Sequence, residues 1–184
     1  LAYEVNVESD NGNFMWEKIM EIGKEFHIEA YGTEALSTLR IEMGHVAGSE
    51  LDGRTIPYDN SLEGLVSKKK DFIGKRSLNR KAFIAEDRQK VVGVVPIDKK
   101  TSIPEGSHLV KNANANLPNP KLGHISASCW SVEYDNPFSL AILKDGKNMI
   151  GQKLFAMSPV KNITIPVEIV SSHYVDPKGE RVRS

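Results

Sequence analysis

The hydrophobic pattern of this chain changes its period near residue 88, and this change limits the folds that the chain can adopt. Beyond this point, apolar and β-branched residues occur in short runs separated by turn residues such as Lys144-Asp145-Gly146-Lys147. The runs cover residues 91–95, 108–110, 123–128, 138–143, 153–156 and 163–170. Short strands at regular spacing, joined by turns, are typical of small barrels and sandwiches. We therefore predict a small barrel or sandwich of antiparallel strands over residues 86–184.

The residues before 86 follow a helical period instead. The first predicted helix carries an apolar stripe whose members recur at spacings of four, three and four residues: Met15, Ile19, Ile22 and Phe26. A second helix is expected to begin at Thr33, to end before Gly44, and to bury three side chains: Leu36, Leu39 and Met43. With a strand over 3–7 and a short helix over 75–83, these elements predict an α+β domain over residues 1–85.

Composition and charge exclude several classes of function. The 24 basic residues balance the 24 acidic ones, which argues against nucleic acid or a membrane surface as a partner held by bulk charge. The single cysteine, Cys129, cannot form an internal disulfide, so we expect a reducing, cytoplasmic location. No apolar run approaches the roughly 20 residues of a spanning helix. The histidines show no ligand spacing, so no metal site is predicted.

Several segments together resemble the aminomethyltransferase superfamily, which includes the T-protein of the glycine cleavage system. The segments shared with that superfamily are 3–7, 31–36, 39–44, 123–128 and 174–181. Residues 67–78 and 104–110 are similar to sarcosine oxidase alpha subunits in particular, and to the C-terminal part of those subunits. The resemblance covers nearly all 184 residues. It implies a partial T-protein-like α+β domain followed by a small C-terminal barrel.

The resemblance also implies a function. Members of the superfamily bind tetrahydrofolate and move a one-carbon unit onto or off it. In the heterotetrameric sarcosine oxidases, a flavin on another subunit oxidises sarcosine, and the folate site of the alpha subunit captures the carbon. We therefore expect a folate-binding module that transfers a one-carbon unit from an oxidised methylamine to tetrahydrofolate, with other sarcosine oxidase subunits as partners.

The module is expected to be incomplete in this chain. The family's catalytic aspartate lies in an N-terminal half that has no counterpart here, so no catalytic residue is assigned. The chain begins with Leu1, within an alternating apolar and polar pattern, and we expect it to be a piece of a longer protein.

Two residues match folate contacts of the family. Glu4 matches the glutamate that recognises the pterin ring, since a carboxylate can accept two hydrogen bonds from the ring's N–H groups. The alternative is an exposed glutamate on the polar face of a strand. Arg40 matches the family arginine near the folate, and it borders the predicted apolar stripe of its helix. Its alternative is a structural ion pair with Glu4 or Glu42, because an unpaired buried charge is costly. We expect Glu4 and Arg40 to face one cavity.

The third candidate is Lys69, in the basic run Lys68-Lys69-Lys70. In the family a basic residue near this position approaches the glutamyl tail of folate, and an ammonium group suits a carboxylate. The alternative is a solvated charge run beside a turn.

The chain departs from the family pattern at two places. Gly64 stands where T-proteins often carry a tryptophan, and residues 131–137 replace the family's Ser-Pro-Thr-Leu-Gly-Arg loop. These departures favour an alternative function, in which the module is a non-catalytic assembly domain that docks flavin-bearing subunits.

Overall fold

The computed structural model describes residues 3–114, 120–181 and 183 of the chain. By its contacts the chain divides into two compact units, residues 1–33 and residues 34–184, which are described separately. The domain boundary that we expect near residue 85 stays a prediction. Among the described residues, no helix is both long enough and apolar enough to cross a membrane.

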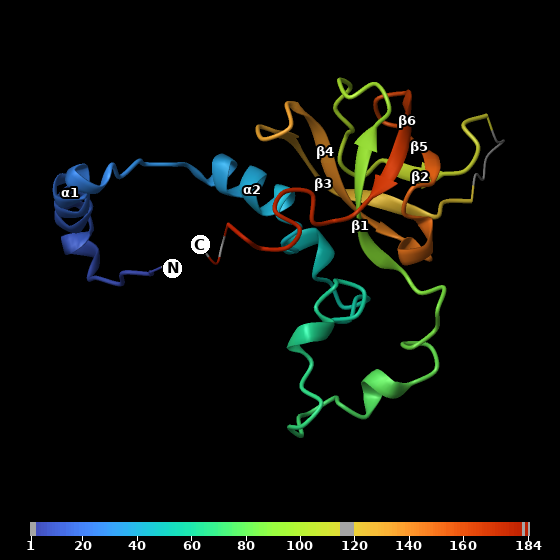
Figure 1. The fold of residues 1–184 in the computed structure, drawn as a ribbon, viewed down its shortest axis with the longest axis horizontal. Helices are drawn as coiled ribbons and strands as arrows, with labels where there is room; N and C mark the ends of the chain where they lie inside the picture. The colour runs from blue at the N-terminus through green and yellow to red at the C-terminus, as the bar shows by residue number, and fades with distance from the viewer. Residues whose placement is uncertain (1–2, 115–119, 182, 184) are drawn as a thin grey trace. The chain divides into compact units, whose positions relative to one another are not determined.

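The described part of the first unit contains one α-helix, flanked by single 3-10 turns. Helix α1 spans Gly12–Gly23, with η1 (Ser9–Asn11) before it and η2 (Lys24–Phe26) after it (Figure 1). The prediction of a helix here is confirmed, and most of its apolar stripe is exposed to solvent. The side chain of Phe26 is 75% exposed and that of Trp16 is 56% exposed. The reason is that the described part of this unit offers the helix no second helix or sheet to pack against.

The strand predicted over residues 3–7 is absent. These residues form an irregular exposed segment, with Tyr3, Val5 and Val7 all exposed to solvent. A strand is stable only when its backbone N–H and C=O groups pair with a neighbouring strand. None of the described strands pairs with this segment, so its alternating pattern does not lead to a sheet.

Helix α2 (Thr33–Glu42) begins where the sequence predicts but buries a different face. Leu36 and Leu39 are half exposed, whereas Ile41 and Glu42 are buried. The expected buried face is therefore wrong. The reason is that only the last turn of α2 packs against the outer surface of the barrel. There Ile41 joins an apolar cluster of strand residues that includes Val91, Ala127, Phe138, Leu140 and Ile142.

The end of α2 is set by Gly44. Its φ of 71° is left-handed, the Gly44 N–H donates to the carbonyl of Ile41 at 3.0 Å, and the His45 N–H donates to that of Arg40 at 2.8 Å. This pair of bonds is a Schellman motif, in which glycine avoids the cost of a side chain at positive φ. A Cβ at this position would also lie 2.5 Å from the carbonyl oxygen of Ser172. Gly44 is therefore required both by the turn and by close packing.

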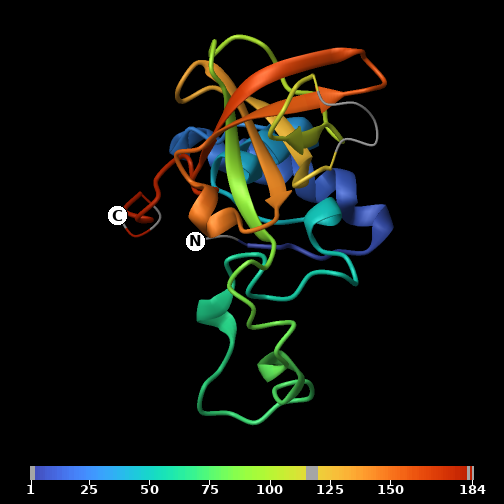
Figure 2. The same cartoon turned by 90° about the vertical axis from the view of Figure 1, so that its right-hand side faces the viewer.

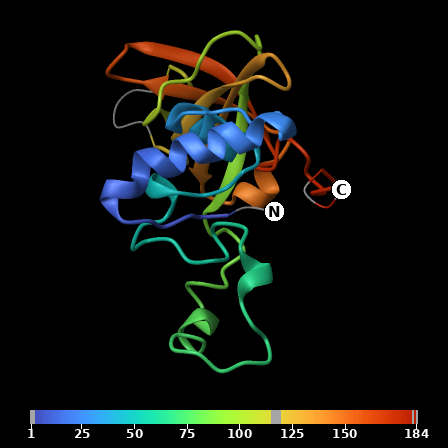
Figure 3. The same ribbon diagram turned by 90° about the vertical axis from the view of Figure 1, so that its left-hand side faces the viewer.

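Residues 45–89 connect α2 to the barrel with only three short 3-10 turns: η3 (Gly48–Glu50), η4 (Glu63–Leu65) and η5 (Ser77–Asn79). Within this connector, residues 61–88 project away from the barrel in all three views (Figure 1, Figure 2, Figure 3). The helix predicted over 75–83 is wrong, since only η5 forms there. A short helix that does not pack on a core is marginal in water, and Arg80 already has an extended backbone.

The six predicted strand runs are confirmed and form a closed antiparallel barrel. The strands are β1 (Lys90–Pro96), β2 (His108–Val110), β3 (Gly123–Ser131), β4 (Asn136–Leu143), β5 (Lys153–Ser158) and β6 (Ile163–Val170). Around the barrel they follow the order β1-β4-β3-β2-β5-β6, and every neighbouring pair is antiparallel. The fold class is therefore α+β with a C-terminal barrel, as predicted.

The barrel has an inner core and an outer apolar cluster. The inner core includes Val92, Val94, Leu109, Ile125 and Val167. A register shift in β3 between Ile125 and Ala127 places Ile125 in the inner core and Ala127 in the outer cluster. Every residue of β4 is buried, because this strand is covered on both faces. On the outer face the ring of Tyr174 stacks on Phe138, with centroids 4.3 Å apart.

Replacing Gly44 by alanine is expected to lower the free energy of unfolding of the second unit by about 1–3 kcal/mol, because an alanine there has positive φ and meets the Ser172 carbonyl. Gly64→Ala is the matched control. Gly64 has ordinary φ and open space around it, so its substitution is expected to be neutral or slightly stabilising. Urea denaturation followed by circular dichroism measures both. Equal stability of the two variants would contradict the assigned role of Gly44.

Candidate functional site

Arg40 lies in the last turn of α2, at the edge of the barrel, with 22% of its side chain exposed. One guanidinium nitrogen, Nη1, donates to Oε2 of Glu50 at 3.1 Å and to the carbonyl of His45 at 3.3 Å. The Nε–H and Nη2 groups have no hydrogen-bond partner among the residues that the structure describes. Arg40 is therefore anchored on one side and retains donors on the other.

Glu50, the partner of Arg40, is fully buried. Its Oε2 also accepts a hydrogen bond from the Ala47 N–H at 2.9 Å, and its Oε1 accepts one from the Ser49 hydroxyl at 3.3 Å. A buried carboxylate needs such donors and a cation, because the charge has lost its water. The turn 47–50 and the end of α2 are thereby held together by one side chain.

A second buried pair joins two parts of the connector, at the base of the excursion. Asp59 is buried and accepts two hydrogen bonds from Arg88, from Nε at 2.6 Å and from Nη2 at 2.8 Å. This two-pronged geometry fits the planar guanidinium to the carboxylate. The carbonyl of Asp59 also accepts from the Val91 N–H at 2.7 Å, next to the start of β1. The residues on either side of the 61–88 excursion are therefore tied to each other.

Glu42 is a third buried acid, on the opposite side of the last turn of α2. Its Oε1 accepts a hydrogen bond from the Ser131 hydroxyl at 2.6 Å, and its carbonyl accepts from the N–H groups of Tyr174 and Val175. Burial, and then the Glu42 carboxylate, raise the pKa of the Cys129 thiol to about 12. The thiol is therefore protonated at neutral pH, and Cys129 is not a nucleophile.

The three predicted site residues lie in different parts of the chain. Glu4 belongs to the first unit, on the exposed segment before α1, and makes no hydrogen bond or ion pair with the described residues. Arg40 and Lys69 belong to the second unit. The expectation that Glu4 and Arg40 face one cavity stays a prediction.

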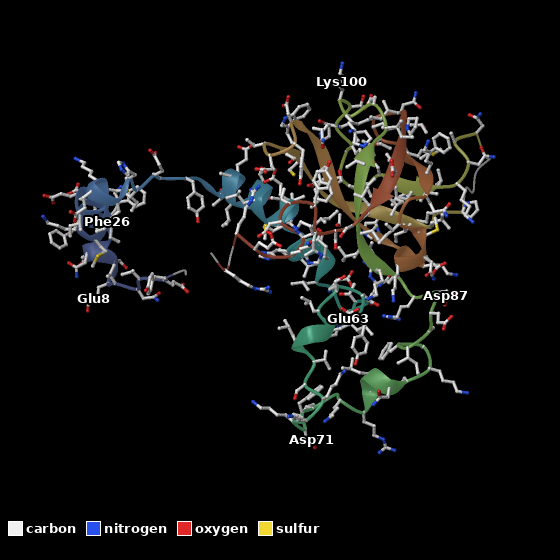
Figure 4. All side chains as sticks on the ribbon, in the orientation of Figure 1. Glu8, Phe26, Glu63, Asp71, Asp87 and Lys100 are labelled. Atoms are coloured by element: carbon white, nitrogen blue, oxygen red, sulfur yellow. The ribbon has the colours of Figure 1, made fainter. Side chains whose placement is uncertain are left out.

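Lys69 lies in an exposed turn of the excursion, near Asp71, which marks its far end in Figure 4. Lys75 holds this turn by donating to the carbonyls of Lys68 at 3.2 Å and Lys70 at 2.6 Å. Within the second unit, this turn and α2 lie apart. The structure therefore does not bring Lys69 next to Arg40.

Sequence reasoning missed Glu50 as the partner of Arg40. The two residues are ten positions apart, and no helical or strand spacing links them. The one local signal is that Glu50 follows Ala47 by three residues, the spacing of a carboxylate that caps the start of a helical turn. In the described ranges, no group of three or more acidic, histidine or cysteine side chains is placed to hold a metal ion.

A protein family, a solved structure and a curated relative each resemble this chain. Residues 1–70 match the family described as the GCVT N-terminal domain. The structure is similar to the glycine cleavage system aminomethyltransferase T from Bartonella henselae, with a TM-score of 0.69 and 19% sequence identity over 90% of this chain and 44% of that one. The chain is also 27% identical to an aminomethyltransferase from Thermoanaerobacter pseudethanolicus over 94% of its length, which is 45% of the relative. The resemblance to the aminomethyltransferase superfamily is thus confirmed.

Within that superfamily, the similarity to sarcosine oxidase alpha subunits is also confirmed. The chain is 37% identical to the alpha subunit from Rhizobium meliloti (strain 1021), over 99% of this chain and 18% of that protein. The alpha subunit from Corynebacterium sp. (strain P-1) is 36% identical over 98% of this chain and 19% of its own length. The chain therefore spans about a fifth of the length of these two relatives.

Replacing Arg40 by alanine is expected to lower the free energy of unfolding by about 3 kcal/mol, because it leaves the Glu50 carboxylate buried without its cation. The double variant Arg40→Ala/Glu50→Gln should recover most of this loss, since the neutral amide needs no cation. Arg54→Ala is the control, and little change is expected because the Arg54 side chain is 82% exposed. Denaturant titration of all three variants measures the effects. Failure of the double variant to recover stability would contradict the role assigned to the pair.

Proposed function

We propose that this chain is a tetrahydrofolate-binding part of a larger one-carbon transfer enzyme of the sarcosine oxidase type. The observation that carries the proposal is the hydrogen bonding of the Arg40 guanidinium. Its position matches the family's folate-contacting arginine, and its guanidinium is held by buried Glu50 through one nitrogen while the other donors remain available. A fixed cation with spare donors suits a carbonyl or carboxylate of a ligand.

The other two candidates have chemistry that fits the same ligand. The Glu4 carboxylate has no partner among the described residues, so it can accept from the N–H groups of a pterin ring. Lys69 is exposed on a turn that Lys75 holds in place, and its ammonium suits the glutamyl tail. When bound, tetrahydrofolate supplies the nitrogens that accept the one-carbon unit, and these residues bind and orient it.

The substrate and the partners of the complete enzyme are part of the same proposal. The relatives from Rhizobium meliloti and Corynebacterium are named as alpha subunits of sarcosine oxidase, which supports an oxidised methylamine as the carbon donor and further subunits as partners. No residue of this chain is assigned a catalytic role. The chain's contribution is to bind folate, and the cytoplasm is the compartment that we propose.

Titration of the full-length protein with tetrahydrofolate tests the proposal. Glu4→Gln and Arg40→Ala are each expected to weaken binding by roughly 1.5–3 kcal/mol, the value of a charge-assisted hydrogen bond, which is about ten-fold or more. Glu8→Gln is the control, because Glu8 lies on the same exposed part of the first unit (Figure 4) and matches no folate contact.

The double variant Arg40→Ala/Glu50→Gln separates folate binding from stability. If Arg40 contacts folate, this variant regains stability while its folate affinity stays low. If the affinity returns together with the stability, Arg40 serves only the ion pair. If Glu4→Gln and Arg40→Ala both bind tetrahydrofolate with unchanged affinity, neither residue contacts folate.

A second function is favoured by the exposed apolar side chains of α1 and η2. Phe14, Trp16, Ile22 and Phe26 each expose more than half of their surface, and such aromatic residues are enriched at protein interfaces. This observation supports the alternative of an assembly domain, in which α1 docks against a flavin-bearing subunit.

Coexpression with the flavin-bearing subunits tests this alternative. The variant Trp16→Ser/Phe26→Ser is expected to reduce the assembled fraction in size-exclusion chromatography at least several-fold, because central aromatic residues carry much of the energy of an interface. Glu17→Ser should assemble as the unchanged protein does, because Glu17 lies in a row of polar residues with Asn13 and Glu21. Full assembly of the double variant would exclude docking through this face.

A further inference from the structure

The second unit contains a cavity of about 520 Å³ near the base of the 61–88 excursion. Its walls are the turn that includes Ser49 and Thr55, the segment 82–89, and the adjoining ends of β3 and β4. Neither Arg40 nor Lys69 lines it. A volume of this size is within the range of small-molecule sites.

The cavity is lined by more positive than negative side chains. Four basic residues and two carboxylates face it. Three of the basic residues have acidic partners: Arg54 with Asp52, Arg88 with Asp59, and Lys144 with Asp87. The fourth, Lys121, makes no ion pair or hydrogen bond with any residue in the described ranges. One ammonium group at the start of β3 is therefore uncompensated.

His124 lines the same cavity and responds to this positive environment. Its pKa is lowered by burial first, and then by the nearby charges of Lys121, Arg54 and His108, while Asp52 raises it slightly. These groups come from the residues just before β3, from the turn at 52–54 and from β2, on which His108 is the register partner of His124. A bound anion would oppose these positive charges and would favour the protonated imidazole.

The rest of the lining is apolar. Ala82 and Ala85 contribute from the last part of the excursion, and Leu122 and Ile142 contribute from the barrel side. An inorganic ion makes no use of such a wall, whereas an organic acid places its carbon chain against it. The cavity thus combines cationic groups for a carboxylate with apolar surface for a carbon skeleton.

We propose that this cavity binds a small organic carboxylate, with Lys121, Arg54 and His124 around the carboxylate and Leu122 and Ile142 against its carbon chain. This site differs from the folate site proposed above, because Arg40 is not among the residues that line the cavity. The two sites can therefore be tested separately.

Isothermal titration calorimetry of the full chain with adipate, a six-carbon dicarboxylate, tests the proposal. Adipate is expected to bind more tightly than inorganic phosphate, and 1,6-hexanediol, which has the same length without charge, is expected not to bind. Lys121→Gln should weaken adipate binding about ten-fold or more, because it removes a charge-assisted contact. Lys100→Gln is the matched control, since Lys100 lies at the opposite end of the barrel from Asp87, a residue of the cavity (Figure 4).

The pH dependence gives a second readout. Adipate affinity should rise as the pH falls from 8 to 6, because protonated His124 adds a positive charge beside the carboxylate, and His124→Gln should remove this dependence. The proposal is overturned if phosphate binds as tightly as adipate, or if adipate does not bind. It is also overturned if Lys121→Gln and Lys100→Gln bind adipate equally well.

Discussion

The outer face of strand β4 is the constraint on which the arrangement of the second unit depends. A closed barrel pairs all its strands, but it normally leaves one face of each strand to solvent. Here the outward side chains of β4 are apolar, and Phe138, Leu140 and Ile142 must be covered. Ile41 from α2 and Tyr174 from the C-terminal segment provide that cover. Burying this surface is what orders the end of α2 against the barrel.

The buried acids follow from that packing. Once the last turn of α2 is pressed on the barrel, Glu42 faces Ser131 on one side, and Arg40 faces the turn 47–50 on the other. Gly44 then reverses the chain tightly enough for Glu50 to reach Arg40. The guanidinium therefore has a fixed position because of an ion pair inside the chain, and this is the property that a ligand-binding arginine needs. The packing of α2 positions Arg40, the turn at Gly44 brings Glu50 to it, and the ion pair then fixes the guanidinium of the candidate site.

The positions of the barrel strands could be predicted from the sequence. For the two helices, the sequence predicted where they form but not which of their side chains are buried. The strands predicted over 91–95 and 163–170 do form, because closure of the sheet gives each of them two neighbouring strands. Among the described residues, segment 3–7 has the same alternation but pairs with no strand, and the first unit offers the apolar stripe of α1 no second helix or sheet. Periodicity reports what a segment could bury, not whether something covers it. Arg40 was found through family resemblance, whereas Glu50 lies in an irregular turn whose partner depends on tertiary packing.

The excursion over 61–88 has a consequence for how this fold can change. Its base is held by Asp59 with Arg88 and by Glu63 with Lys90, so the barrel meets it only through a clamped pair of ends. Closing a loop costs free energy that grows only logarithmically with its length, about 0.6 kcal/mol for each doubling. Residues can thus be inserted or deleted between the clamps at little thermodynamic cost to the barrel. The excursion is therefore a part of the fold that can vary in length and sequence while the two ion pairs hold its ends together.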